Sequence, residues 1–341
     1  MTGLERIGAA LQGNFADRRA FAMTLSLYGS RLAGSAPKDY YREPERYRGG
    51  QAAVASLVDP DVLFGPFAMP LEAEAWGATL AWTEKAPPNV AKPLRSVQAF
   101  LGGEAPSPDS DPRLSYLVES VRLVAADNAG ARPVAAVATC PSDLPAMALG
   151  IDAWLEILLF DPDLAARVLE RSGEHFRALC GAYATAGAAF VAVPVMFANP
   201  RILPEALVRE LVVPYLAREF GAAGLPVVFH HGANPLAEYL PLFAGLPGVA
   251  GFALAERDDS GAARDALGPG VLLLGGVEGP TLSRRPLARV LEAARSALRA
   301  RAADPRFVFA TASADVPWDT EPATLVALAE TVRESELARG P

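Results

Sequence analysis

Eight short apolar runs recur along the chain, and polar or helical segments separate most of them. A strand covered on both faces reads as a continuous run of Val, Ile, Leu, Ala and Phe, so each run predicts a buried parallel strand. Between most of these runs the apolar positions recur at helical spacing, which indicates βαβ units and a parallel α/β fold. The predicted strands are Phe21–Ser26, Asp61–Phe67, Pro133–Thr139, Ala188–Met196, Pro226–His231, Val249–Glu256, Val271–Val277 and Phe307–Ser313, and clear helical patterns cover Asp163–Ala184, Pro204–Ala222, Leu236–Phe243 and Pro286–Ala302.

The spacing of these runs predicts one domain over residues 1–341, with a helical extension at about 1–18. A stretch rich in proline and glycine, at about 86–112, predicts a long loop or excursion before the third strand. Such a segment is either a functional lid or a solvated insertion.

Composition narrows the classes of function. Hydrophobic residues form 51% of the 341 residues and charged residues 21%, which is typical of a folded globule with a large core. The net charge is −8 and no basic run is long enough to follow a phosphate backbone, so nucleic acid is not an expected partner. No apolar stretch reaches the length of a membrane span, and no apolar signal segment opens the chain. Two cysteines give no disulfide framework, and we expect a cytoplasmic protein.

Two adjacent histidines, His230 and His231, stand at the end of the fifth predicted strand. Neighbouring side chains on a strand point to opposite faces, and a bend at the strand end would bring both to the same opening. Imidazole is a common metal ligand and a general base near neutral pH, so the pair suits either role. The alternative is one functional histidine beside one packing histidine. The third histidine, His175, lies within a helical pattern and is expected on the surface.

Other polar and aromatic residues follow predicted strands and are candidates to contact a substrate. A carboxylate there could hold a cationic group, and an indole could stack on a flat ligand. In the alternative interpretation they are hydrogen-bonded rim residues or solvated charges. They are Tyr28, Glu72, Glu74, Trp76, Asn199, His231, Asn234, Glu256, Glu278, Asp315 and Trp318.

Segments taken in order along nearly the whole chain resemble the methylcobamide:coenzyme M methyltransferase branch of the uroporphyrinogen decarboxylase superfamily. They include Gly13–Arg18, Tyr41–Glu45, Pro70–Gly77, Pro226–His230, Gly275–Pro280 and Ala314–Thr320. The resemblance implies a (β/α)₈ TIM barrel of the uroporphyrinogen decarboxylase type, with its site at the carboxyl ends of the strands.

The chain departs from the family at its signature residues. The zinc-dependent methyltransferases carry a His-x-Cys-Gly-Asn element after strand five and a further Cys after strand eight. Here Gly232 and Ala314 stand near those positions. The Asp and His elements of the true decarboxylases are missing too. Zinc is therefore possible but not favoured, and if a metal is bound, its ligands would be His230, His231 and Glu278.

The resemblance implies a methyltransferase that moves a methyl group between a small substrate and a corrinoid, with His230, Glu278 and Asp315 as catalytic residues. The chain holds no corrinoid-binding segment of the Asp-x-His-x-x-Gly type, so the methylcobamide is expected on a separate corrinoid protein. Related barrels are monomers or homodimers. A decarboxylase or lyase of the same superfamily and a non-catalytic ligand-binding homologue are the alternatives, and the methyl donor and acceptor stay open.

Overall fold

The computed structural model describes residues 1–94, 96–335 and 337. It contains one eight-stranded parallel sheet, with one strand overlapping each of the eight predicted segments. Residue 95 of the predicted excursion, and residues 336 and 338–341 of the predicted domain, lie outside the described residues. The strand order is β1-β10-β9-β8-β7-β6-β5-β2, and a parallel bridge between Ala22 and Val62 joins the two end strands. The sheet is thus a closed barrel. Its strands are β1 Phe21–Ala22, β2 Leu63–Phe64, β5 Val134–Val137, β6 Phe190–Pro194, β7 Val227–His230, β8 Val249–Ala253, β9 Leu272–Glu278 and β10 Phe307–Ala312.

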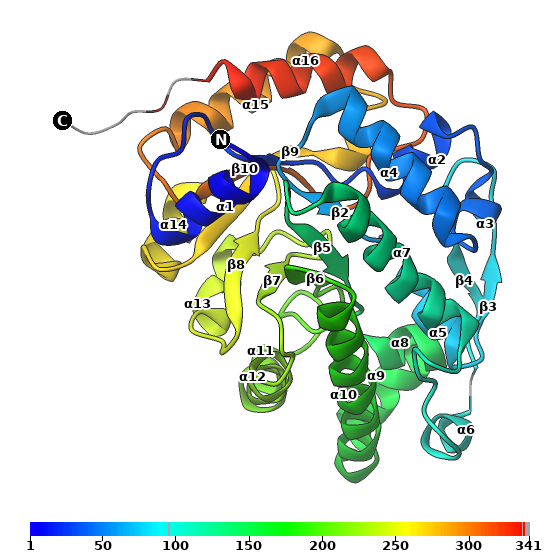
Figure 1. Ribbon diagram of the computed structural model, residues 1–341. Coiled ribbons are helices and arrows are strands. Elements are labelled where there is room, and N and C mark those ends of the chain that lie inside the picture. Colours follow the sequence, from blue (N-terminus) through cyan, green and yellow to red (C-terminus); the bar gives the residue numbers. More distant parts are fainter. Residues whose placement is uncertain (95, 336, 338–341) are drawn as a thin grey trace.

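Helices surround the strands as an outer ring, which is the predicted TIM-barrel arrangement (Figure 1). None of the helices formed by the described residues is long and apolar enough to cross a membrane. The helices of the first half are α1 Gly3–Gln12, α2 Ser26–Leu32, α3 Pro37–Tyr40, α4 Pro44–Val58, α5 Pro70–Ala75, α6 Val97–Leu101, α7 Pro112–Asn128, α8 Leu144–Leu149, α9 Ile151–Phe160 and α10 Pro162–Thr185. Those of the second half are α11 Glu205–Leu207, a π-helical turn Val208–Val212, α12 Val213–Gly221, a 3₁₀ turn Ala237–Tyr239, α13 Leu240–Phe243, α14 Ser260–Leu267, a 3₁₀ turn Gly279–Thr281, α15 Leu287–Ala300 and α16 Pro322–Arg333.

The segment predicted as an excursion, 86–112, is more regular than its composition suggested. It contains β4 Asn89–Lys92, which pairs antiparallel with β3 Thr79–Ala81 in a small hairpin, and it also contains α6. Both strands of the hairpin are largely exposed, so neither shows the apolar run that marks the barrel strands.

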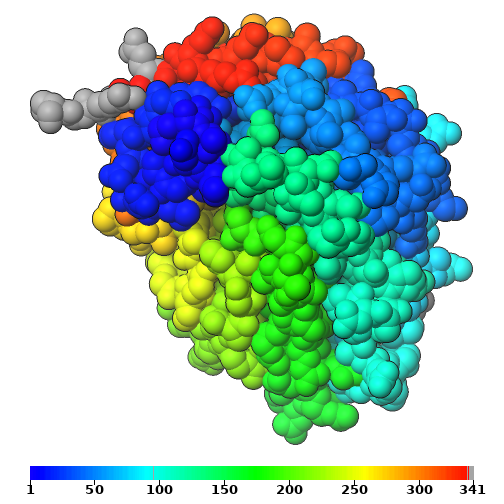
Figure 2. Space-filling view, viewed as in Figure 1, coloured from blue at the N-terminus to red at the C-terminus, as the bar shows by residue number. Residues whose placement is uncertain are grey.

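The amino-terminal helix α1 lies beside β10 at the amino ends of the strands (Figure 1). Thr2 and Glu5 form a reciprocal capping box at its start. Its apolar residues Leu4, Ile7 and Leu11 lie at that end of the barrel, and the dark blue surface at the left of Figure 2 belongs to the amino-terminal segment.

A buried carboxylate, Asp61, fastens α1 and β1 to the start of β2. It accepts hydrogen bonds from Arg6 at 3.0 Å and Arg18 at 2.7 Å, and from the backbone N–H of Phe21 at 2.9 Å. Its side chain is almost fully buried. The two guanidinium groups and the N–H together compensate the charge that burial takes out of water.

The interior of the barrel is lined by small side chains together with a few larger ones such as Phe64, Phe190 and Leu272. Large residues such as Phe229, Phe252 and Phe309 belong to the core between strands and helices, whereas Ala22, Ala192 and many other inward residues are small. Barrel interiors of this fold are usually filled by branched side chains. Here a cavity of about 210 Å³ remains along the axis.

We predict that Asp61→Ala destabilises the protein by about 3–5 kcal/mol, since removing one partner of a buried ion pair leaves the other charges uncompensated. Chemical denaturation followed by circular dichroism measures the change. The matched control is Glu43→Gln, which breaks the exposed pair with Arg46 and should hardly move the transition. Equal effects of both substitutions would contradict the assigned role of Asp61.

Candidate functional site

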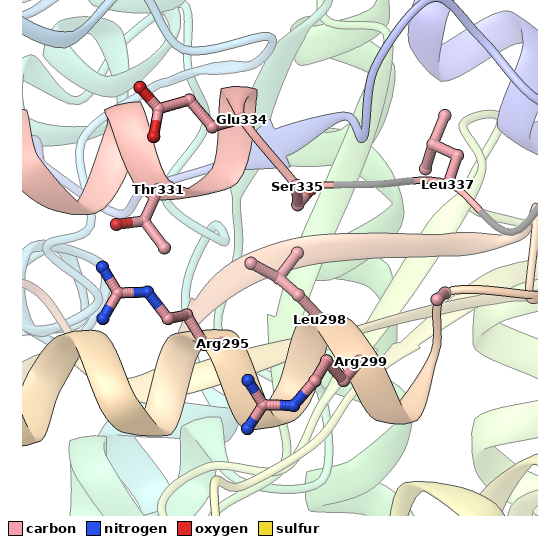
Figure 3. Close-up of a pocket in the computed structure, with 8 residues that line it drawn as sticks. Arg295, Leu298, Arg299, Thr331, Glu334, Ser335 and Leu337 are labelled. Carbon is pink, nitrogen blue, oxygen red and sulfur yellow. The ribbon is translucent and has the colours of Figure 1, made fainter.

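The candidate site lies at the carboxyl ends of the strands, where His230 ends β7, Glu278 ends β9 and Asp315 follows β10. This is the end at which TIM-barrel enzymes carry out catalysis. A second hollow, of about 440 Å³, lies where α15 and α16 end. Figure 3 shows Arg295 and Leu298 of α15 facing Thr331 and Glu334 of α16. It lies at the opposite end of the barrel, because α15 ends just before β10 begins.

His231 holds two strand ends together and is almost completely buried. Its Nδ1 donates to the carbonyl oxygen of Asn234 at 3.1 Å, and its Nε2 accepts from the backbone N–H of Ser313 at 3.0 Å. Ser313 follows β10, which is separated from β7 in the sheet by β8 and β9. Burial lowers the pKa of His231 to about 4, so the ring is neutral at pH 7. Both nitrogens are occupied, which leaves neither for a metal or a substrate.

His230 stacks on His231 with ring centroids 4.7 Å apart, and it has one nitrogen to spare. Its Nδ1 accepts the backbone N–H of Gly232 at 3.1 Å. Burial, with a smaller contribution from His231, holds the pKa of His230 well below its usual value. The ring is therefore neutral at pH 7, and its proton lies on Nε2. His230 lines the axial cavity, and within the described residues no group bonds its Nε2. The arrangement presents one N–H donor to a ligand.

The position of the family's first zinc cysteine has no room for a side chain. Gly232 has φ +58°, and a Cβ built on it would lie 2.4 Å from the carbonyl oxygen of Val195. The next residue, Ala233, also has a positive φ, of 73°. Within the described part of the chain no three His, Cys, Asp or Glu side chains are grouped to hold a metal. The residues present therefore do not fit the zinc site of the related methyltransferases.

Glu278 carries a half-buried carboxyl at this end. Its side chain has the same inward direction along β9 as Leu272 and Leu274, which line the cavity. Partial burial raises the pKa of its carboxyl, against the lowering effects of the backbone N–H of Glu256 and the cations of Arg257 and Arg285. Glu256 is occupied differently: it accepts the backbone N–H of Glu278 at 2.6 Å and pairs with Arg285 at 2.7 Å.

Asp315 caps a helix rather than facing the cavity. Helix α2 has Leu25 at its cap position, which offers no side-chain acceptor, and the carboxylate of Asp315 accepts the N–H of Leu27 at 2.7 Å. The other carboxylate oxygen is buried with no partner among the described residues. Burial raises the pKa of Asp315 to about 8, against the opposing effect of the backbone donors.

Glu72, Glu74 and Trp76 lie in and just after α5, outside the barrel, so the structure does not bring them to the cavity. Glu72 is buried and bonds the backbone N–H of Thr139 at 2.7 Å and Nε2 of His175 at 3.1 Å. The expectation of an exposed His175 is wrong, because only 2% of it is exposed. Trp76 stacks on Phe100 with centroids 4.3 Å apart, and Glu74 pairs with Arg42 at 2.7 Å.

The remaining candidates order the loops around the mouth. The Tyr28 hydroxyl donates to the carbonyl of Thr320 at 2.8 Å. The amide groups of Asn199 and Asn234 both donate to the carbonyl of Met196, at 2.9 and 3.0 Å. Trp318 is half-buried, with the cations of Arg31 and Lys85 5.4 and 5.3 Å from its ring centroid.

Sequence reasoning missed Asp143, which holds the loop after β6. Its buried carboxylate accepts the backbone N–H groups of Met196, Phe197 and Ala198 at 2.5, 3.1 and 3.0 Å. Burial raises its pKa to about 6 despite these donors. Asp143 belongs to no sequence motif that would predict a contact with the loop after β6, so the contact is seen only in the structure.

Comparisons with known proteins agree with this architecture. The family model described as uroporphyrinogen decarboxylase (URO-D) matches residues 2–335. A methyltransferase from Methanosarcina mazei is similar in structure, with a TM-score of 0.82 and 18% identity over 98% of this chain and 99% of that one. A B12-independent methionine synthase from Shewanella sp. W3-18-1, solved with selenomethionine, has a TM-score of 0.56 and 13% identity over 87% and 89% of the two chains. At these identities the likenesses show the fold alone. The comparison with curated proteins gives no match.

We predict that the free energy of unfolding of Asp315→Asn, relative to that of the parent, increases as the pH rises from about 4 to about 8. The folded state keeps a proton on Asp315 up to a pKa of about 8, whereas the unfolded chain loses it near the ordinary value of 3.8. The parent therefore loses stability across that window, and asparagine has no proton to lose. Urea denaturation of both proteins at several pH values measures the difference. A difference independent of pH would contradict the raised pKa.

A second prediction concerns the closed position at Gly232. Gly232→Ala should cost about 1–3 kcal/mol more than Gly34→Ala, because the added Cβ meets the Val195 carbonyl in addition to straining the backbone. Gly34 is the matched control, with φ +60° and open space around it. Thermal unfolding of the two variants makes the comparison, and equal losses would show that the Val195 loop moves freely.

Proposed function

The chain belongs to the uroporphyrinogen decarboxylase family, and from that membership we propose that it is a methyltransferase. It would move a methyl group between a small substrate and a corrinoid carried by a separate protein. The observation that carries the proposal is the neutral His230, whose one free N–H is presented at an apolar cavity.

The lining of the cavity favours a substrate that is uncharged where it enters the cavity. Among the described residues, no Lys, Arg, Asp or Glu side chain lines it. A decarboxylase acting on carboxylate groups would need cations there to hold them. Two arginines near the mouth are paired elsewhere, since Arg285 pairs with Glu256 and Arg201 lies 3.7 Å from Glu238. A third, Arg257, is exposed and lowers the pKa of Glu278.

The chain's own residues would position the substrate and handle one proton. The Nε2–H of His230 would donate to the heteroatom that carries the methyl group, and its direction is held because Gly232 occupies Nδ1. A neutral imidazole can act in this way as a hydrogen-bond donor. Glu278, with its raised pKa, would accept or deliver the proton of that heteroatom.

The corrinoid, when bound, supplies the cobalt that accepts or donates the methyl group. The protein contributes orientation and the exclusion of water, which strengthen a hydrogen bond such as that of His230. Zinc has no part in this proposal, because Gly232 offers no thiolate and both nitrogens of His231 are already bonded.

A ligand-binding protein without catalysis is the second candidate. It is favoured by Asp315, one of the three predicted catalytic residues, because its carboxylate caps α2 rather than facing a ligand.

We predict that His230→Ala lowers the rate of methyl transfer by about 10²-fold or more, which is typical of losing a positioned hydrogen-bonding group. The assay follows methyl transfer between methylcobalamin, or a methylated corrinoid protein, and a panel of thiol, amine, hydroxyl and folate acceptors. His230→Gln keeps an N–H donor and should retain more activity than the alanine variant.

Thermal stability within a few degrees of the parent is the control for both variants. A stable His230→Ala protein with the parental rate would remove His230 from the mechanism. If the parent transfers no methyl group to or from any corrinoid, the enzyme proposal fails and ligand binding remains.

A further inference from the structure

The axial cavity extends from His230 at the mouth to α1 at the opposite end of the barrel. Small side chains from strands all round the barrel line it beside the larger Phe64, Phe190, Leu272 and Leu274. They are Ala22, Ala192, Ala253 and Ala310, with Val228 and Val308. A packed barrel would fill this space with larger branched residues. The alanines are what keep it open.

A firmly held helix lines the lower end of the cavity, which opens to solvent there because Leu4 and Leu11 are each 48% exposed. Leu4, Ile7 and Leu11 of α1 line the cavity there. The backbone N–H of Leu4 donates to Ala131 at 3.0 Å, and Arg6 bonds Asp61 at 3.0 Å. The cavity thus opens beside α1, and its polar groups lie at the inner end, where the buried Thr24, Thr311 and His230 line it.

The size and chemistry of the pocket restrict what it can hold. Its volume of about 210 Å³ exceeds the roughly 150 Å³ of an engineered apolar cavity that stays dry and binds benzene. A charged molecule would lose its hydration and find no ionic partner in the described lining. At the mouth, the Nε2–H of His230 needs an acceptor.

We propose that this axial pocket binds a small neutral molecule, with an apolar body about the size of a benzene ring in the barrel and one hydrogen-bond acceptor at His230. The inference rests on the proposed function only in calling this molecule the methyl-transfer substrate. Binding itself requires neither the corrinoid nor turnover.

The first test compares ring-sized probes on the intact protein: anisole, toluene, benzoate and benzylamine. Ligand-observed NMR titrations give the dissociation constants. Anisole should bind about tenfold or more tightly than benzoate and the benzylammonium ion, because burying an unpaired charge is costly. It should also bind more tightly than toluene, which lacks an acceptor for His230. Benzoate or benzylammonium binding as tightly as anisole would overturn the proposal.

The second test fills the pocket. Ala192→Leu and Ala310→Leu each place a larger side chain in the cavity wall, and each should weaken anisole binding about tenfold or more. Ala184→Leu, at an exposed position on α10, is the matched control and should leave binding unchanged. If one cavity variant fails to fold, the other carries the test, and the probe series on the parent stands without either.

The two proposals fail separately. If both cavity variants abolish anisole binding but the parent transfers no methyl group, the pocket proposal stands and the methyltransferase proposal fails. Two results would refute the pocket proposal. One is methyl transfer by a protein that binds none of the four probes, and the other is unchanged anisole binding in the folded cavity variants.

Discussion

His231 bonds across the mouth of the barrel, and the geometry of the candidate site depends on that contact. Its two nitrogens connect the loop after β7, at Asn234, with the residue after β10, Ser313. Ser313 has φ 72°, a conformation that a residue with a side chain rarely adopts, and its N–H points to His231 as a result. A buried polar group without a partner would cost more than a single hydrogen bond contributes, so this arrangement resists change. The neighbouring His230 stacks on a ring that cannot turn.

Burial of the apolar pocket also explains why His230 beside it is a neutral hydrogen-bond donor. With no charged side chain in the described lining, burial keeps His230 neutral, and its bond from Gly232 decides which nitrogen holds the proton. Asp315 and Asp143, by contrast, are engaged by backbone N–H groups and hold α2 and the loop after β6. Within the described lining of the cavity, the polar group of His230 left free toward a ligand is its Nε2–H, and Glu278 lies outside that lining.

The fold could be predicted from the sequence because barrel strands are buried on both faces and so appear as continuous apolar runs. The hairpin β3–β4 gave no such run, since its residues are mostly exposed. The position of His230 and Glu278 at strand ends was also predictable. The roles of neighbouring residues were not: Glu72 and Trp76 follow a strand in sequence, but α5 carries them into contacts with His175 and Phe100 outside the barrel. Likewise, the sequence favoured His230 as catalytic but also placed His231 at the ligand, and their hydrogen bonds show that both nitrogens of His231 are already engaged.

The proposed site depends most on the protonation state and tautomer of His230, which nitrogen-15 NMR of the histidine side chains measures directly. We expect His230 to show a protonated Nε2 and an unprotonated, hydrogen-bonded Nδ1 that do not change between about pH 6 and pH 8. A ring that titrates near pH 6.5, or one with its proton on Nδ1, would contradict the assignment of His230 as the neutral donor above the axial pocket.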